Sequence, residues 1–441
     1  MTPDSQLVAR IRSDAAEALL SRYGEDARAG RERLSPEDEK VYARRIIANA
    51  LEADARRVIA EGGTLLTEEV EDAAAQAVFD ALFGLGGLQP WLEDESVTDV
   101  HVQGYDQVFV VHEDGTKRQV GPVASSDDEL VALIRFAAAR MGRSERRFDP
   151  ANPEVNLRLP DGSRLFAVMS VSARPSVSIR RHRFPKVFLD DLERLGTIDG
   201  ALSSFLSAAV KARKNVIVAG GTSMGKTTLL RALINEISPY ERIVTVEDSL
   251  ELGVDRFADL HPDVVSLEAR EANVEGEGAV TLETLVRMAL RMDPDRVIVG
   301  EVRGDEILPM LNAMSQGNDG SMCTIHAHSS ASVFSKLAMY AMQTPQRLPL
   351  EATNLLVANA VDFIVHLGRE SASDRRGPRH VTSVREVLDA DGPIVSSNEV
   401  FRPGPGGRAT PGSPMRAETA EAMEAAGFDS RLLASLRRVW L

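Results

Sequence analysis

One short stretch limits the fold of this chain more than any other. Residues 215–230 read NVIVAGGTSMGKTTLL, in which Gly220 is followed after four residues by Gly225, Lys226 and Thr227. This spacing fits the G-x-x-x-x-G-K-[ST] pattern. An apolar run precedes the first glycine and helix-forming residues follow the lysine, which predicts a buried strand, a loop and then a helix. We interpret the stretch as a phosphate-binding loop.

Each residue type in this loop suits a nucleoside triphosphate. Glycines let the backbone approach a phosphate closely, and the unpaired N–H groups at the start of the next helix attract an anion. Lys226 is expected to reach the β- and γ-phosphates, and the hydroxyl of Thr227 to bind Mg²⁺ that keeps most of its water. The predicted cofactors are therefore ATP and Mg²⁺. The loop residues expected to contact the nucleotide are Gly220, Gly221, Thr222, Ser223, Met224, Gly225, Lys226, Thr227 and Thr228.

Composition narrows the class of protein. The 441 residues, 43% of them hydrophobic, suit about three domains with their own cores. No run of eighteen apolar residues occurs and the first twenty residues carry charges, so we expect neither a spanning helix nor a signal peptide, and place the protein in the cytoplasm. The net charge of -15 argues against a general nucleic-acid coat. Residues 158–186 are a local exception, with six arginines and one lysine against one aspartate.

The pattern of apolar residues changes along the chain and predicts four regions. Residues 1–88 show helical spacing and are expected to form a small bundle. Residues 89–184 alternate short strands with one main helix, which is typical of an α+β domain. Residues 185–385 alternate strands and helices, which predicts a mainly parallel sheet covered on both faces. Residues 386–441 are expected to be a C-terminal tail with a proline- and glycine-rich linker and short helices.

The basic stretch gives the second region a candidate function. Residues 155–159 alternate so that Val155, Leu157 and Leu159 share one face and Arg158 faces the other way. Such arginines are either solvated strand residues or ligands of nucleotide phosphates, which a planar guanidinium binds through two hydrogen bonds. The sequence alone leaves both interpretations open.

Four polar residues follow predicted strands of the third region. Glu301 ends the apolar run 297–300, and Glu247 and Asp248 end another such run. Because ligands of open α/β sheets bind at the carboxyl ends of the strands, these acids are candidates for holding Mg²⁺ or orienting water. Each could instead cap a helix. His326 ends a further strand and is either a sensor of the γ-phosphate or a buried structural histidine.

At this point the residues resemble a known family. The segments GGTSMGKTT, RIVTVEDSLEL, RMALRMDPDRVIVGEVRG and GNDGSMCTIHA are similar to the motifs of the type II/IV secretion ATPase superfamily, and most similar to its branch that powers Tad/Flp pilus assembly. The resemblance covers roughly residues 87–385, including LPDGSR and SIRR.

The resemblance implies a RecA-like P-loop NTPase domain, preceded by an α+β, PAS-like N-terminal domain and a helical extension, in a homohexameric ring. It also implies roles for single residues. Lys226 and Thr227 match the Walker A pair, Glu301 the Walker B acid, Glu247 and Asp248 the acidic box, and His326 the histidine box. The arginines at the positions where the family's N-terminal domain approaches phosphates are Arg158, Arg164, Arg180 and Arg181.

Two positions depart from the family's pattern. The histidine box of the family usually opens glycine-histidine-x-glycine, whereas this chain has Asn318 at the histidine position. An asparagine forms hydrogen bonds without a titratable charge. The phosphate loop has Ser223 and Met224 where the family commonly has glycine and serine. If the loop needs a positive φ there, Ser223 has to accept backbone strain.

The sequence therefore predicts a motor ATPase that powers a Tad/Flp-type pilus. Lys226, Glu301, Glu247 and His326 are the expected catalytic residues, and Thr227 and Glu301 the expected Mg²⁺ site, partly through water. Which glutamate is the base stays open. The expected partners are further copies of the chain and inner-membrane platform proteins, which would bring it to the inner face of the cell membrane without stable nucleic-acid binding. The alternatives are a type IV secretion or conjugation ATPase, a nucleic-acid translocase and a nucleotide-dependent scaffold with negligible turnover.

Overall fold

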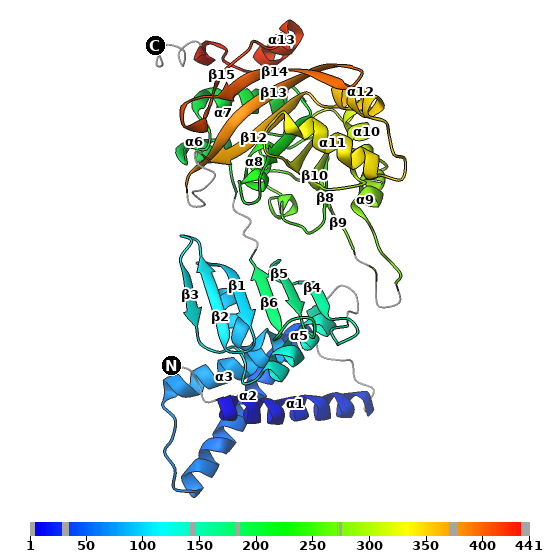
Figure 1. Ribbon diagram of the computed structural model, residues 1–441. Helices are drawn as coiled ribbons and strands as arrows, with labels where there is room; N and C mark the ends of the chain where they lie inside the picture. Colours follow the sequence, from blue (N-terminus) through cyan, green and yellow to red (C-terminus); the bar gives the residue numbers. More distant parts are fainter. Residues whose placement is uncertain are drawn as a thin grey trace. The chain divides into compact units, whose positions relative to one another are not determined.

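The computed structural model describes residues 5–28, 35–141, 147–181, 186–270, 272, 276–369 and 377–433. The chain divides into two compact units, Met1–Arg183 and Phe184–Leu441 (Figure 1). Among the helices in these ranges, none combines the length and the apolar character that a membrane span requires.

Unit 1 begins with three helices in the region where helical spacing was predicted: α1 (Ser5–Arg28), α2 (Pro36–Ala60) and α3 (Glu68–Phe83). Helix α2 starts at a capping serine, because the Ser35 side chain accepts a hydrogen bond from the Asp38 N–H. The apolar faces of the three helices meet in one small cluster, formed by Leu7, Ile11, Ala15, Ile47, Leu51, Ala74 and Val78.

The rest of unit 1 is an antiparallel sheet with the strand order β3-β2-β1-β6-β5-β4. Its strands are β1 (Val97–Gln103), β2 (Gln107–His112), β3 (Lys117–Val120), β4 (Glu154–Arg158), β5 (Arg164–Val168) and β6 (Ser176–Arg180). A short η1 (Gly86–Leu88) and α4 (Gln89–Glu93) lead into the sheet, and α5 (Asp127–Met141) lies between β3 and β4 in the chain. The predicted alternation is confirmed, since Val155, Leu157 and Leu159 are buried in the core of this unit.

Unit 2 is built on a nine-stranded sheet with the order β15-β14-β13-β12-β7-β11-β10-β8-β9. The six strands from β12 to β9 in this order run parallel, as the alternation of strands and helices predicted. They are β7 (Val216–Gly220), β8 (Ile243–Glu247), β9 (Val264–Glu268), β10 (Arg296–Val302), β11 (Met322–His326) and β12 (Phe363–Arg369).

Helices cover both faces of this sheet (Figure 1). One face packs against α6 (Leu189–Arg194), α7 (Gly200–Lys211), α8 (Lys226–Ile234) and α13 (Ala417–Ala425). The other packs against α9 (Leu282–Ala289), α10 (Ile307–Ser315), α11 (Ser332–Gln343) and α12 (Leu350–Ala360). Burial on two sides explains why the central strands are almost continuous apolar runs.

The predicted C-terminal tail from residue 386 onward is wrong in its first part. Strands β13 (Arg379–Asp391), β14 (Ile394–Pro403) and β15 (Ala409–Pro411) extend the sheet in antiparallel fashion beyond β12. Within the stretch that was read as a linker, Pro403 ends β14, residues 405–407 form η3 (Pro405–Gly407), and Pro411 ends the edge strand β15. Proline is tolerated in an edge strand because one side of it forms no ladder hydrogen bonds. In the described part of the tail, α13 matches the short helices that were predicted.

Candidate functional site

The phosphate loop lies between β7 and α8, as its sequence predicted. Gly225 caps the N-terminus of α8 with φ +90°, a left-handed conformation that favours glycine. At Gly220 a Cβ atom would lie 2.8 Å from the carbonyl oxygen of Leu367 on the neighbouring strand β12. Both glycines are therefore required by the backbone, which curls tightly in front of the helix.

The departure at Ser223 and Met224 has a structural consequence. Ser223 has φ +60°, so the positive φ expected at this position is adopted by a serine. A non-glycine residue in the left-handed region loses about 1–2 kcal/mol. The side chain of Met224 folds back over Gly220 and Gly221 and packs against the hydrophobic core of the α8 face. Burial of this methionine offsets part of the strain at the serine.

Lys226, His326 and Glu301 come together beside the loop. His326 lies opposite Gly220 in the register of β11 and β7. The Lys226 ammonium donates to the carbonyl oxygen of Gly221 at 3.1 Å and lies 3.2 Å from Nδ1 of His326. The same ammonium lies 3.4 Å from Nε2 of His326, and this Nε2 lies 2.6 Å from Oε1 of Glu301. Three of the predicted catalytic residues thus form a continuous chain of contacts from the phosphate loop to β10.

A β-bulge explains the position of Glu301. Between the pairs Val299–Cys323 and Val302–Ile325, β10 has one residue more than β11, and a bulge of this kind redirects side chains. The 2.6 Å contact with His326 is not aligned as a hydrogen bond, so Oε1 of Glu301 is buried with no hydrogen-bond partner in the described part of the chain. A buried, unsatisfied carboxylate oxygen next to the phosphate loop fits a metal ion or a bound water.

The charges of Lys226, His326 and Glu301 influence one another. Burial lowers the pKa of Lys226, while the nearby Glu301 carboxylate opposes this shift. Burial, followed by the Lys226 charge, lowers the pKa of His326, and Glu301 again acts in the opposite direction. Burial and the Lys226 charge therefore favour the neutral form of His326. A ring nitrogen without a proton can accept a hydrogen bond from the Lys226 ammonium, which lies within 3.4 Å of both nitrogens.

The structure gives Glu247 a different environment from Glu301. Its side chain is 2% exposed, and Oε2 accepts hydrogen bonds from the N–H groups of Glu251 and Leu252, both at 2.7 Å. Burial raises the pKa of Glu247 to about 7. The carboxyl group anchors the turn that follows β8. It also packs on Gly300, where a Cβ atom would lie 3.1 Å from its Cγ.

Arg303 joins the two acidic strand ends. Its Nη2 lies 3.0 Å from Oδ2 of Asp248, and its Nε lies 3.9 Å from Oε2 of Glu301. Arg303 was not among the predicted site residues, although it lies in the same motif as Glu301, two residues further on. Its position at the end of a strand was a signal that could have identified it, because this position places Arg303 at the same edge of the sheet as the acids.

The four arginines predicted to bind phosphate lie in unit 1. Arg158, Arg164 and Arg180 are direct neighbours across β4, β5 and β6, so they form a single row. Arg180 also lies 3.6 Å from Oδ1 of Asp99 on β1. Arg181 differs, because its guanidinium donates to the backbone carbonyl oxygens of Asp94 and Val97 within the same unit.

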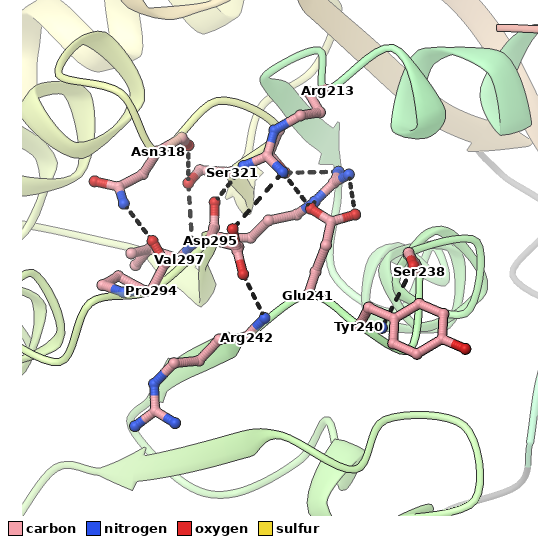
Figure 2. Close-up of polar contacts among 12 residues, drawn as sticks. Arg213, Ser238, Tyr240, Glu241, Arg242, Pro294, Asp295, Val297, Asn318 and Ser321 are labelled. Atoms are coloured by element: carbon pink, nitrogen blue, oxygen red, sulfur yellow. Dashed lines mark hydrogen bonds and ion pairs between the residues drawn. The ribbon is translucent and has the colours of Figure 1, made fainter.

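Asn318 lies at the opposite edge of the sheet from the phosphate loop. Its Nδ2 donates to the carbonyl oxygen of Pro294 at 2.6 Å, and its own carbonyl accepts from Ser321, just before β11 begins (Figure 2). The loop is found at the carboxyl end of the parallel strands, whereas β11 starts at Met322. The four residue steps of β11 correspond to about 13 Å. Within its own unit Asn318 is thus part of a structural turn.

Asn318 belongs to a larger polar cluster at this amino edge (Figure 2). Arg296 is 1% exposed and binds both carboxylate oxygens of Glu241, at 2.8 and 2.9 Å. Arg213 binds Glu241 as well, at 2.6 Å, and donates to the carbonyl oxygen of Asp295. A buried charge that is paired in this way fixes the ends of β8 and β10 relative to the helix–strand turn before β7.

The described residues fit a nucleotide with Mg²⁺. The loop backbone and the start of α8 offer N–H groups to phosphate oxygens, and Lys226 adds a positive charge beside them. Thr227 is the second residue of α8, one position after Lys226. Its hydroxyl and the unsatisfied Oε1 of Glu301 are oxygen donors, which Mg²⁺ prefers.

The fold and this site define a RecA-like α/β domain with a phosphate loop, preceded by an α+β domain. The chain matches the family model "Type II/IV secretion system protein" over residues 85–401. It is 38% identical over 321 residues to "Putative conjugal transfer protein Rv3659c" of Mycobacterium tuberculosis, which covers 71% of this chain and 87% of that protein. It is 31% identical over 342 residues to type IV secretion system protein VirB11 of Brucella suis, which covers 71% of this chain and 92% of that protein.

Among solved structures, the ATPase DotB of Legionella pneumophila matches with a TM-score of 0.50 and 17% identity, over 70% of this chain and 81% of that chain. This likeness supports the fold. The family match covers most of the chain, and the identity to the relatives extends over most of their length. The protein belongs to the type II/IV secretion system protein family.

Proposed function

We propose that the protein is an ATP-hydrolysing motor that drives a secretion or pilus machine. The observation that carries this proposal is the contact chain from Lys226 through His326 to Glu301, which joins the phosphate loop to an acidic strand end. Family membership supports it, and the motif residues Lys226, Glu301 and His326 lie together at the carboxyl edge of the unit 2 sheet.

Each group of residues at the site has a separate role in this proposal. The loop N–H groups and Lys226 hold the β- and γ-phosphates and stabilise the charge that develops on them. Mg²⁺, when bound, supplies further positive charge to these oxygens, with Thr227 and Glu301 as its ligands, partly through water. Glu301 orients the attacking water. His326, in contact with both Lys226 and Glu301, responds to loss of the γ-phosphate.

The two glutamates then have separate roles. Glu301 has an unsatisfied oxygen close to Lys226 and His326, whereas Glu247 is buried and bound to two backbone N–H groups. We therefore assign the chemical step to Glu301, and to Glu247 the anchoring of the turn that carries Asp248. Arg303 holds Asp248 and limits the movement of Glu301.

Steady-state turnover tests this division. Glu301→Gln is expected to lower kcat at least about 100-fold, in the range of a lost catalytic group. Glu247→Gln keeps an oxygen for the two N–H groups and is expected to lower kcat less than about tenfold. Equal losses in both variants would contradict the division, and unchanged hydrolysis in both would exclude the assignment of these acids.

The proposed assembly is a homohexameric ring in the cytoplasm, bound to platform proteins at the inner face of the cell membrane. In such a ring we propose that the row of Arg158, Arg164 and Arg180 approaches nucleotide phosphates. Arg181 is a weaker candidate, because its side chain is engaged within unit 1. Size measurement by light scattering with and without ATP tests the ring.

Two machines are candidates for the partner. The motif resemblance favours a Tad/Flp-type pilus, whereas the relatives named VirB11 and PtlH, 31% and 33% identical, favour type IV secretion. Deletion of the gene, followed by electron microscopy of surface pili and by a conjugation assay, separates the two. Loss of pili with normal conjugation supports the pilus. The reverse result supports type IV secretion.

A further inference from the structure

Two arginines from the C-terminal part of unit 2 lie beside the phosphate loop. Arg369 ends β12 and Arg379 begins β13, and the two residues are direct partners across these antiparallel strands. Strand β12 runs parallel to β7, with Leu367 opposite Gly220. The arginine pair therefore lies at the edge of the sheet where the phosphate loop begins, although it is about 150 residues away in the chain.

The side chain of Arg379 reaches the loop itself. Its Cδ lies 3.8 Å from the position that a Cβ on Gly225 would occupy. Gly225 is the N-cap of α8 and directly precedes Lys226. The guanidinium begins one bond beyond Cδ, and Arg379 is exposed, so a ligand can reach it. Within unit 2, a phosphate held at the start of α8 is then close to a second cation besides Lys226.

The charges at this position favour an anionic ligand. Cations directly opposite each other on neighbouring strands repel. Partial desolvation of its side chain and the nearby Arg369 charge both lower the pKa of Arg379. Among the described residues, no carboxylate forms an ion pair with Arg379. A negatively charged group bound at this edge converts the repulsion into attraction.

We propose that Arg379 is a phosphate-binding residue of the nucleotide site, contributed by the same unit as the phosphate loop, and that Arg369 supports it electrostatically. The ligand class is a nucleoside di- or triphosphate, whose oxygens a planar guanidinium binds through two hydrogen bonds. This assignment rests on the proposed function. Arg379 differs from the arginine row of unit 1, because Arg379 and the phosphate loop belong to the same unit.

Binding of a fluorescent ADP analogue to the full chain tests the proposal. Arg379→Gln is expected to raise its Kd about tenfold or more, since a hydrogen bond to a charged group is lost. Arg379→Lys is expected to recover part of the affinity. The Kd of Arg379→Gln should also depend less on salt. Arg402→Gln, at an exposed arginine of β14, is the matched control and should bind as the unmodified protein does.

Equal ADP affinity in Arg379→Gln and the unmodified protein would overturn the proposal. Unchanged ADP affinity together with a loss of turnover only in the assembled ring would also overturn the proposal. Such a result would place Arg379 at a contact between copies of the chain. A far-ultraviolet spectrum matching that of the unmodified protein shows that the variant is folded. Absence of ADP binding in the unmodified protein would overturn the proposed function, and this assignment with it.

Discussion

The replacement Glu247→Gln is expected to remove a pH dependence from the stability of the protein. The Glu247 carboxyl group is 2% exposed, and burial raises its pKa from 4.5 to about 7. Between these two values the folded protein keeps a proton that the unfolded chain has released. The free energy of unfolding therefore falls as the pH rises through this range.

The magnitude follows from the pKa difference. Each pKa unit corresponds to about 1.4 kcal/mol, so the rise to about 7 corresponds to about 3 kcal/mol lost between about pH 4.5 and about pH 7. Glutamine does not titrate, and its carbonyl oxygen can still accept from the N–H groups of Glu251 and Leu252. The variant should therefore keep its stability at neutral pH better than the unmodified protein.

Urea unfolding between about pH 5 and about pH 7, followed by far-ultraviolet circular dichroism, measures this effect. Glu418→Gln is the matched control, because Glu418 is exposed on α13. The control should keep the pH dependence of the unmodified protein. If Glu247→Gln keeps it as well, the attribution to the buried carboxyl group is refuted.

Three further predictions concern other parts of unit 2. Ser223→Gly relieves a left-handed serine and adds flexibility to the unfolded chain, so a net gain of about 0.5 kcal/mol is expected in urea unfolding; a loss would show that the serine is not strained. Glu241→Ala leaves the buried Arg296 without its carboxylate and should destabilise the protein by about 3–5 kcal/mol in the same assay; a change below about 1 kcal/mol would contradict the paired-charge account. Asn318→His should leave the Kd for ADP unchanged, because this residue lies at the far edge of the sheet from the loop; a severalfold change would contradict that placement.

The phosphate loop and the central strands could be predicted because their signals are local. Strands buried on both faces are short apolar runs, and glycine spacing, lysine and threonine follow from the needs of a phosphate. The same holds for the alternation in β4, where a single buried face leaves a period of two in the sequence. The row that Arg158 forms with Arg164 and Arg180 depends on strand register, so only its members could be named from the sequence.

The C-terminal strands were missed because they lack these signals. Strand β13 has a partly exposed face with charged residues such as Arg385, and β15 contains a proline. A half-exposed edge of a sheet resembles a linker in composition, since its stability comes from pairing with β12 rather than from local propensity.

The sequence predicted which residues belong to the candidate site but not how these residues are arranged. Whether Glu301 or Glu247 faces the loop depends on a bulge in β10 and on two backbone hydrogen bonds, which no spacing rule contains. The motif resemblance grouped Asn318 with the candidate site. In the structure, β11 lies between Asn318 and His326 and separates the two ends of that motif. Arg379 reaches the loop only through the pairing of β12 with β7.

The most direct test of the central claim is multiple-turnover release of phosphate from ATP and Mg²⁺ by the full chain and by Lys226→Ala. Lys226 contacts both Gly221 and His326, so its removal takes away the charge at the phosphates and the first contact of the chain to Glu301. The unmodified protein is expected to show steady turnover, and the variant a loss of at least about 100-fold. Turnover in Lys226→Ala at the rate of the unmodified protein would contradict the claim.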